Sequence, residues 1–406
     1  MKKIGLLTYH SVCNFGANLQ SLSTYSYFKN KEYDVKFINW ELDSLEDYYK
    51  RITPLEQYES HHAFFKKYIE TTSICKSDED IAKIIDAEGM SNIIVGSDAV
   101  MQHHPLLSRI SFPSRRILTI SSIGSDRLAP NLFWGSFMPF LNKKVVLCMM
   151  SGSNQNSSYN LMVASKRKEL EKHLLHFSYI STRDDWTSKM VSFITKGKII
   201  PPVTPDPVFG FNYNVKNQPS RYDILQKFGL PDKYILLSFH NSSTVSLEWL
   251  TRFKQLASSK GYLCVAFPFP GGVKFNHNLD KIIDIPLSPL DWYCLIKYSS
   301  GYVGHNMHPI VVSLHNATPC FSFDNYGIVR FKLFVNEKSS KIFHIMNEFG
   351  LLQNRCSCVS RFYKEPDPKF VMDRLTSFPY KQVKSKSDIF LNNYLKMMSD
   401  IEQFLI

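Results

Sequence analysis

Three histidines occur within one short segment, GHNMHPIVVSLHNATPC, which runs from Gly304 to Cys320. Histidine is suited to proton transfer because its ordinary pKa, about 6.5, lies near neutral pH. His308 directly precedes a proline, and proline is favourable at the first position of a helix. We therefore expect His308 at the mouth of a helix, where the helix dipole favours an anionic ligand. His305 is expected to end the preceding strand, and His315 to be structural or at the helix surface.

Carboxylates and an arginine follow two other apolar segments. Asp98 ends the stretch NIIVGSD, directly after Ser97, and is a candidate general base or sugar-positioning group. Aspartate is equally the residue type that caps the N-terminus of a following helix. Arg183, in the stretch STRDD, is suited to bidentate contact with a phosphate or carboxylate. The alternative is an arginine–aspartate pair that holds a turn, and the residues alone leave both alternatives open.

A glycine-containing loop precedes the first expected helix, in the stretch NFGANLQ from Asn14 to Gln20. Gly16 would let backbone amides approach a ligand, and a helix N-terminus favours an anion. The stretch matches neither the dinucleotide fingerprint nor the P-loop pattern, so it gives little support to nucleotide binding. A tight strand–helix turn is the interpretation that the residues alone favour.

Short apolar stretches alternate with amphipathic ones along the chain, which predicts parallel sheets in an α/β fold. The alternation restarts after residue 214, so we expect two Rossmann-like units in series, over residues 1–213 and 214–385, and a C-terminal helix over residues 386–406. In open α/β sheets, ligands bind beyond the carboxyl ends of the strands. That rule selects the loops that hold Asp98, Arg183 and His308, and also the loop that begins at His240.

The C-terminal helix is amphipathic. Its expected start is near Ser387, a plausible N-cap. Its apolar residues fall on one face: Phe390, Tyr394, Met397, Ile401 and either Phe404 or Leu405. Because the polar face carries few lysines, we expect the helix to pack back on the first unit rather than lie on a membrane.

The composition of the 406-residue chain, 44% hydrophobic and 21% charged, excludes disorder for the bulk of it. The net charge of +12 is spread along the chain without a basic run, which argues against nucleic acid as a partner. It fits either attraction to anionic substrates or membrane surfaces, or simply a lysine-rich surface.

The eight cysteines form no CxxC pair, which is typical of a reduced, cytoplasmic protein, and no residue cluster has metal-site spacing. No stretch has the length of a membrane helix, so any membrane association would be peripheral, at the inner face.

Five stretches together carry a resemblance to a known family. In chain order they are KIGLLTYHSVCNFGANLQSLS, NIIVGSDAV, YISTRDDWTSKMV, PDPVF and SGYVGHNMHPIVVSLHNATPCFSFDNYG. They resemble the polysaccharide pyruvyl transferase family, from about residue 3 to about residue 330. The resemblance implies a GT-B-like fold, with two Rossmann-like domains facing across a cleft. It also implies transfer of the pyruvyl group of phosphoenolpyruvate onto a pair of sugar hydroxyls, as a ketal, in cell-surface polysaccharide synthesis.

Carried over position by position, the resemblance implies two catalytic residues, His308 as the acid or a donor-phosphate contact and Asp98 as the base or a sugar-positioning group. The other expected substrate-binding residues are Asn14, Gly16, Gln20, Ser97, Arg183, Asn306 and His240. Family members commonly carry arginine or serine where this chain has Asn306. If an arginine at that position normally helps to bind the donor phosphate, another residue must supply the charge here, and the candidates are Arg183, Arg330 and Lys332.

The expected partners are phosphoenolpyruvate as donor substrate and a sugar or lipid-linked oligosaccharide as acceptor, with no cofactor and no metal. Two alternatives stay open. One is a GT-B-like glycosyltransferase that uses a nucleotide sugar. The other is a catalytically degenerate member of a glycan-synthesis complex, which Asn306 and the sequence Ala99–Met101 after Asp98 would suggest.

Overall fold

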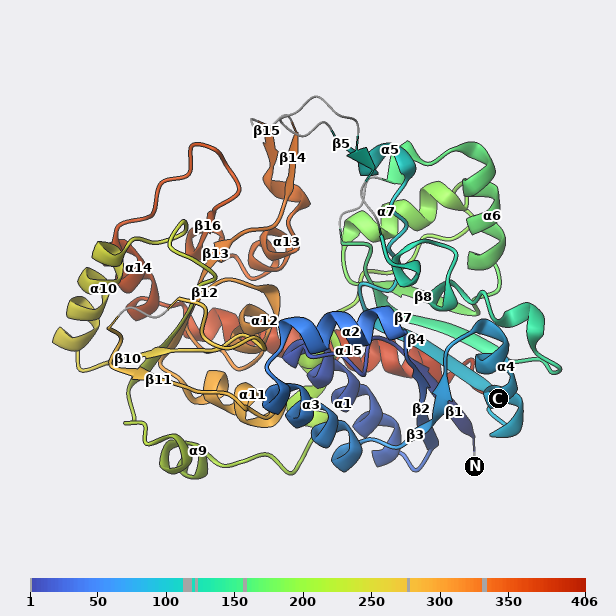
Figure 1. Cartoon of the computed structure of the whole chain (residues 1–406), viewed down its shortest axis with the longest axis horizontal. Coiled ribbons are helices and arrows are strands. Elements are labelled where there is room, and N and C mark those ends of the chain that lie inside the picture. The colour runs from blue at the N-terminus through green and yellow to red at the C-terminus, as the bar shows by residue number, and fades with distance from the viewer. Residues whose placement is uncertain (1, 112–118, 121–122, 156–158, 276–277, 331–333) are drawn as a thin grey trace.

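Two six-stranded parallel sheets lie side by side in the computed structural model, which describes residues 2–111, 119–120, 123–155, 159–275, 278–330 and 334–406 (Figure 1). We call the part that contains the first sheet the first unit, and the part that contains the second sheet the second unit. The alternation of strands and helices that the sequence predicts is therefore confirmed, and each unit is Rossmann-like.

The first sheet has the strand order β3-β2-β1-β4-β7-β8. Its strands are β1 (Lys3–Leu7), β2 (Asp34–Trp40), β3 (Thr71–Cys75), β4 (Asn92–Asp98), β7 (Val146–Gly152) and β8 (Tyr179–Thr182). Every residue of β7 is buried, as is typical of a parallel strand with helices on both faces of its sheet.

The helices of the first unit cover both faces of this sheet (Figure 1). They are α1 (Phe15–Asn30), α2 (Asp43–Ile52), α3 (Leu55–Tyr68), α4 (Asp78–Ala87), α6 (Ala164–Leu174) and α7 (Asp185–Ile194). Between β4 and β7 the chain forms the short elements α5 (Leu106–Arg109), β5 (Ile110–Ser111), β6 (Thr119–Ile120), η1 (Ser125–Arg127), η2 (Leu132–Trp134) and η3 (Met138–Phe140).

The second sheet has the order β11-β10-β9-β12-β13-β16. Its strands are β9 (Tyr234–Ser238), β10 (Leu263–Ala266), β11 (Lys281–Ile282), β12 (Gly301–Gly304), β13 (Cys320–Asp324) and β16 (Arg355–Ser357). Its helices are α9 (Arg221–Phe228), α10 (Leu247–Ser259), α11 (Pro289–Tyr298), α12 (Met307–His315), α13 (Lys341–Glu348) and α14 (Pro368–Thr376). A separate hairpin, β14 (Ile328–Arg330) and β15 (Phe334–Asn336), follows β13.

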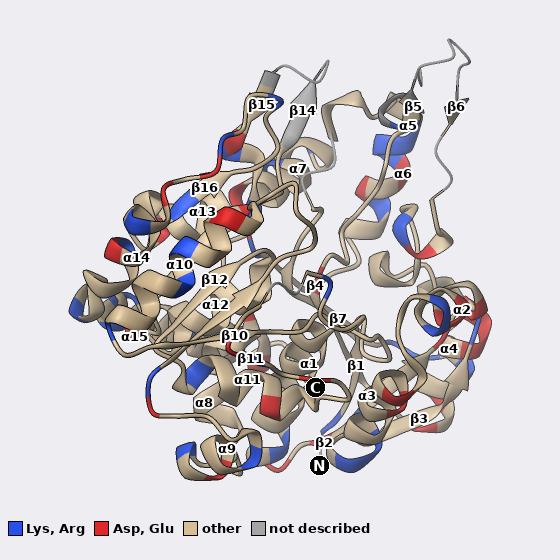
Figure 2. Ribbon diagram, turned by 60° about the vertical axis from the view of Figure 1, so that its left-hand side comes forward, with Lys and Arg blue, Asp and Glu red and all other residues tan. Residues whose placement is uncertain are grey.

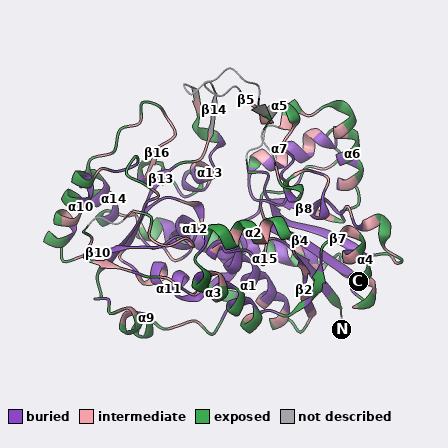
Figure 3. Ribbon diagram, in the orientation of Figure 1, coloured by how far each residue is buried: buried purple, intermediate pink, exposed green. Residues whose placement is uncertain are grey.

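Three clusters of buried apolar side chains are found among the described residues, and one of them spans both units. Figure 3 shows the strands and the inner faces of the helices buried, and Figure 2 shows the charged residues gathered on the outer helices. The largest cluster of buried side chains continues from α1 through α11 and α12 to α15 (Tyr380–Glu402). Phe15 of the first unit stacks on Trp292 of the second, with ring centroids 5.2 Å apart. The cleft is therefore held by direct packing between the units.

The C-terminal helix, α15, packs on the first unit as predicted. The Tyr394 hydroxyl accepts a hydrogen bond from the Asn214 side chain, and Asn92 in β4 bonds both the amide and the carbonyl of Ile406. The helix also contacts α12 of the second unit. Its predicted start near Ser387 is wrong, because the helix already begins at Tyr380. Ser387 is buried within it, and its hydroxyl donates to the carbonyl of His315, so it caps no helix.

Among the described residues, no helix is both long and apolar enough to span a membrane.

Candidate active site

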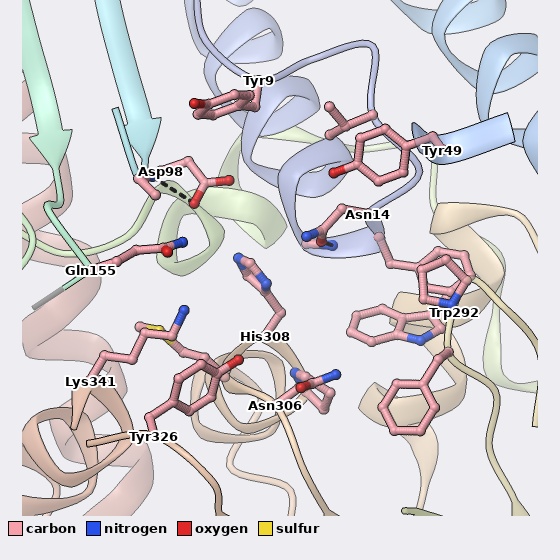
Figure 4. A pocket seen from close by; sticks show the side chains of 18 of the residues that line it. Tyr9, Asn14, Tyr49, Asp98, Gln155, Trp292, Asn306, His308, Tyr326 and Lys341 are labelled. Carbon is pink, nitrogen blue, oxygen red and sulfur yellow. Dashed lines mark hydrogen bonds between the residues drawn. The ribbon is translucent and has the colours of Figure 1, made fainter. Parts of the chain in front are cut away.

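A cavity of about 300 Å³ opens where the carboxyl ends of the two sheets face each other. Residues that directly follow strands of both sheets line it, which agrees with the rule that ligands bind beyond strand ends. Figure 4 shows the side chains that matter most: Tyr9, Asn14, Tyr49, Asp98 and Gln155 from the first unit, and Trp292, Asn306, His308, Tyr326 and Lys341 from the second.

His308 lies at the centre of this group, at the start of α12 (Figure 4). It is the second residue of the helix, and Pro309 is the third, so the proline does not open the helix as the sequence suggested. Asn306 is the N-cap residue, with φ 75° and ψ 151°. Such backbone angles are costly for a residue other than glycine and tend to occur at functional sites.

The His308 ring is buried, and its Nε2 has no hydrogen-bond partner within the described residues. Burial lowers the pKa of His308, although the carboxylates of Asp206 and Asp98 oppose that shift. The imidazole is therefore mainly neutral at pH 7, and its buried Nε2 is left without a hydrogen bond to the described residues.

Gly16 makes room for this ring. A Cβ atom at position 16 would overlap the imidazole of His308, so only glycine fits beneath it. The backbone amides of Gly16 and Ala17 donate to the Asn14 side chain, which caps α1. Gly16 lines the cavity, so its predicted role in ligand binding stays a prediction, and the structure adds a contact with His308. Asn14 itself lines the cavity.

Asp98 ends β4 and points into the cavity (Figure 4). Its Oδ1 accepts a hydrogen bond of 2.8 Å from the amide of Ala99 and lies 3.8 Å from Nη2 of Arg183. Asp98 does not cap a helix, because the next helix starts only at Leu106 and has Pro105 at its N-cap. The sequence left open whether Asp98 belongs to the site or caps a helix, and the structure supports the first interpretation.

Arg183 lies behind the cavity rather than in it. Its side chain is 5% exposed, and Nη1 lies 2.9 Å from Oδ2 of Asp206. With Asp98 as its second neighbour, the guanidinium is already engaged by two carboxylates. The arginine–aspartate pair, left open by the sequence, is therefore the arrangement observed. Asp184 beside it caps α7.

Gln20 and Ser97 also lie behind the cavity wall. The Gln20 amide donates to Asp206, and the Ser97 hydroxyl donates to the carbonyl of Ser151 at 2.8 Å. Neither side chain lines the cavity. Both side chains instead bond residues behind the cavity wall. The sequence pattern therefore located the site, but it did not distinguish the residues that line the cavity from those that support the lining.

His240 lies at the edge of the site. Its ring stacks on Phe269, with centroids 4.0 Å apart, and Nε2 is 3.4 Å from Oδ1 of Asn306. Asn306 and Phe269 line the cavity, whereas His240 does not line it and contacts these two residues from behind. Of the other predicted cations, Lys332 and the side chain of Arg330 lie outside the described residues.

Lys341 is a cavity residue that the sequence reasoning missed. It is the first residue of α13, and Ser340 caps that helix. The Lys341 ammonium lies 4.4 Å from the ring centroid of Tyr326. Burial, followed by the nearby Arg183, lowers the pKa of Lys341 to about 8. No motif in the sequence marks this lysine, since only the fold brings α13 beside α12.

The opposite end of the cavity is aromatic and apolar. Leu45 and Tyr49 of α2, Phe269, and Trp292 of α11 line it. Arg127 stands at the side of the cavity, 47% exposed, with Asp126 3.7 Å away. Among the described residues, no group of three histidine, cysteine, aspartate or glutamate side chains is placed to hold a metal ion.

Solved structures similar to the chain share its fold. The UDP-GlcNAc 2-epimerase from Neisseria meningitidis bound to UDP-GlcNAc superposes with a TM-score of 0.55 at 8% identity, over 99% of this chain and 100% of that one. A UDP-GlcNAc 2-epimerase from Methanocaldococcus jannaschii gives 0.53 at 10% identity, over 98% and 99%. A UGT transferase from Siraitia grosvenorii in complex with UDP gives 0.50 at 10% identity, over 99% and 100%. The chain therefore has the GT-B fold.

Sequence comparison identifies the family more closely than fold does. The family model for polysaccharide pyruvyl transferase matches residues 14–326, well over half of the chain. Among curated proteins, none matches the sequence. The matched region begins at Asn14 and ends at Tyr326, so it includes His308 and Asp98 but stops before α13.

Proposed function

The chain belongs to the polysaccharide pyruvyl transferase family, and from this premise we propose that it moves the pyruvyl group of phosphoenolpyruvate onto two hydroxyls of a sugar. The products would be a cyclic ketal and phosphate. The observation that carries the proposal is that His308 and the Asp98 carboxylate, one from each unit, line the same cavity.

The reaction needs a proton donor and a base. His308 would protonate the terminal carbon of the enol, which makes the adjacent carbon an oxocarbenium-like electrophile. A sugar hydroxyl then forms a C–O bond to that carbon, and Asp98 would receive its proton. Cleavage of the C–O bond to phosphate regenerates the electrophile, and the second hydroxyl closes the ring. Of the two hydroxyl protons, one replaces the proton given to the methyl group and the other leaves with phosphate.

Protonation of His308 would depend on the donor. In the free protein, burial lowers the pKa of His308, so the ring is mainly neutral at pH 7. A bound anion next to the imidazole favours its charged form and raises that pKa. Binding of the anionic donor would therefore charge the acid at the moment when it is needed.

The two walls of the cavity would bind different substrates. The second unit holds His308 and Lys341, so we assign the donor to it. The first unit holds Asp98, Asn14 and Gln155, whose polar side chains suit sugar hydroxyls, so we assign the acceptor to it. The acceptor would be a precursor of a capsule or exopolysaccharide. We propose that the enzyme acts in the cytoplasm, and at the inner face of the membrane when the acceptor is lipid-linked.

The test combines phosphoenolpyruvate with a panel of sugars and lipid-linked oligosaccharides. Phosphate release should depend on the acceptor, and the product should carry the mass increment of a pyruvyl ketal. His308→Gln should lower turnover about 10²- to 10⁴-fold. The matched control is His176→Gln, at an exposed histidine outside the cavity, which should keep full turnover. Absence of both turnover and phosphoenolpyruvate binding would reject the proposed function.

A further inference from the structure

Lys341 is a cation in the cavity without a carboxylate partner in the described structure. Its closest described neighbour is the face of the Tyr326 ring, 4.4 Å from the ammonium. It is also the first residue of α13, where the positive end of the helix dipole disfavours a cation. A desolvated charge without an ion-pair partner costs stability, and the cation–π contact and the carboxylates of Asp98, Asp184 and Asp206, beyond ion-pair distance, offset only part of that cost. Such a position suggests that a ligand supplies the missing negative charge.

In the described part of the chain, two other cations near the cavity, Arg183 and Arg127, each lie beside a carboxylate. Arg183 contacts Asp206 and Asp98 behind the wall, and Arg127 is half-exposed beside Asp126. An anion that bound either arginine would have to displace the carboxylate that already contacts it, and the displaced carboxylate would lose its ionic partner. Lys341 requires no such exchange, because its ammonium already points toward His308 at the centre of the cavity (Figure 4).

We infer that Lys341 holds the phosphate group of the donor, beside the imidazole of His308, which lines the same cavity. The inference rests on the proposed function. Where other family members commonly carry arginine or serine, this chain has Asn306, and Lys341 would supply the positive charge instead. A lysine is a compact point charge with three donors and suits a phosphate group, whose oxygens present no single plane. The two groups come from consecutive helices of the second unit, α12 and α13, so both lie on the wall assigned to the donor.

A purely structural role is the competing explanation for Lys341. In that case its ammonium would serve to orient Tyr326, and removal of the charge would destabilise the fold. If Lys341 instead serves to bind a ligand, Lys341→Met removes a charge that has no ion pair with the described residues, and it retains an unbranched apolar side chain. The melting temperature of K341M should then equal or exceed that of the wild type, while donor binding falls.

The experiment measures binding of phosphoenolpyruvate, inorganic phosphate and UDP by calorimetry to the full chain and its variants. We expect K341M to bind phosphoenolpyruvate and phosphate about 10- to 100-fold more weakly than the wild type, the range typical of a hydrogen bond to a charged group. K341R should recover part of the affinity. K338M, at an exposed lysine in the preceding turn, makes the same change in net charge and should bind like the wild type.

The outcomes separate this inference from the proposed function. Undiminished phosphoenolpyruvate binding by K341M, or a lowered melting temperature, overturns the role of Lys341 and leaves pyruvyl transfer intact. Lys341-dependent binding of UDP without any binding of phosphoenolpyruvate overturns pyruvyl transfer and supports Lys341 as the phosphate-binding residue. A wild type that binds none of the three ligands overturns both.

Discussion

The two walls of the cavity are built on different principles. On the first unit, Asp98 is held by the Ala99 amide and by Arg183, which Asp206 neutralises in turn. On the second unit, His308 Nε2 and the Lys341 ammonium have neither a hydrogen bond nor an ion pair with the described residues. The first wall is therefore organised by internal pairs before any ligand arrives. The second wall contains the groups that, in our proposal, find their partner in the donor.

The largest expected effect comes from breaking the internal pair of the first wall. Arg183→Met leaves two carboxylates near each other without their cation, and loss of one partner of a buried pair typically costs about 3–5 kcal/mol. Urea unfolding should show this loss. The exposed pair Lys384–Asp388 is the control, and Lys384→Met should cost less than about 0.5 kcal/mol. A stable R183M variant that lost only donor binding would move the phosphate site from Lys341 to Arg183.

Gly16→Ala should disturb the second wall from the opposite side of the cleft. The added methyl group overlaps the His308 ring and must displace it, and a displacement of about 1 Å can cost about 100-fold in rate. Phosphate-release assays should show a fall in kcat of that order. Gly301→Ala is the control, because its added methyl group makes only ordinary contacts, and it should retain activity.

The same substitution distinguishes the ring contact from a general effect on the fold. In a His308→Ala background, Gly16→Ala should cause little further loss, since the ring that it displaces is gone. Additive losses would show that Gly16 acts through another residue.

The charge on Lys341 predicts a pH dependence of stability. Its pKa is lowered to about 8 on folding, so between that value and the ordinary value near 10.5 the unfolded chain binds more protons than the folded one. Stability relative to K341M should therefore rise with pH across this interval, by about 2 kcal/mol. The groups that act on Lys341 are Arg183, Asp98, Asp184, Asp206 and His308. Denaturant unfolding of both proteins at pH 7 and pH 10 measures the difference, and a constant difference would show that Lys341 is not desolvated.

The smallest effect concerns the acid. If His308 is the acid, as we propose, it must be protonated to act, and its pKa in the free protein is lowered, so kcat/KM should fall about tenfold per pH unit above a midpoint below 6.5. Because a bound anionic donor would raise that pKa, the corresponding fall in kcat should lie at higher pH. Coincident midpoints would mean that the donor does not contact His308.

The sequence predicted the fold and the location of the site because both depend on local patterns. Apolar strands that end in polar loops were enough to select Asp98 and His308, and both line the cavity. The role of Arg183 could not be predicted, because its partner Asp206 is distant in sequence and the pairing exists only in three dimensions. No sequence motif marks Lys341. It was selected only because, in the described structure, no carboxylate forms an ion pair with its ammonium group. The start of α15 was misplaced because Ser387 looks like a cap but bonds His315 instead.

The contact between the His308 ring and Gly16 has a consequence for movement of the two units relative to each other. The imidazole belongs to the second unit, yet the backbone that supports it belongs to α1 of the first. If the units separated to exchange substrates, the ring would lose its support and regain rotameric freedom. Closing the cleft would then restrict that freedom again and aim the acid. The enzyme would thus be competent only when shut, and a proton could not reach the enol while the site stood open to water.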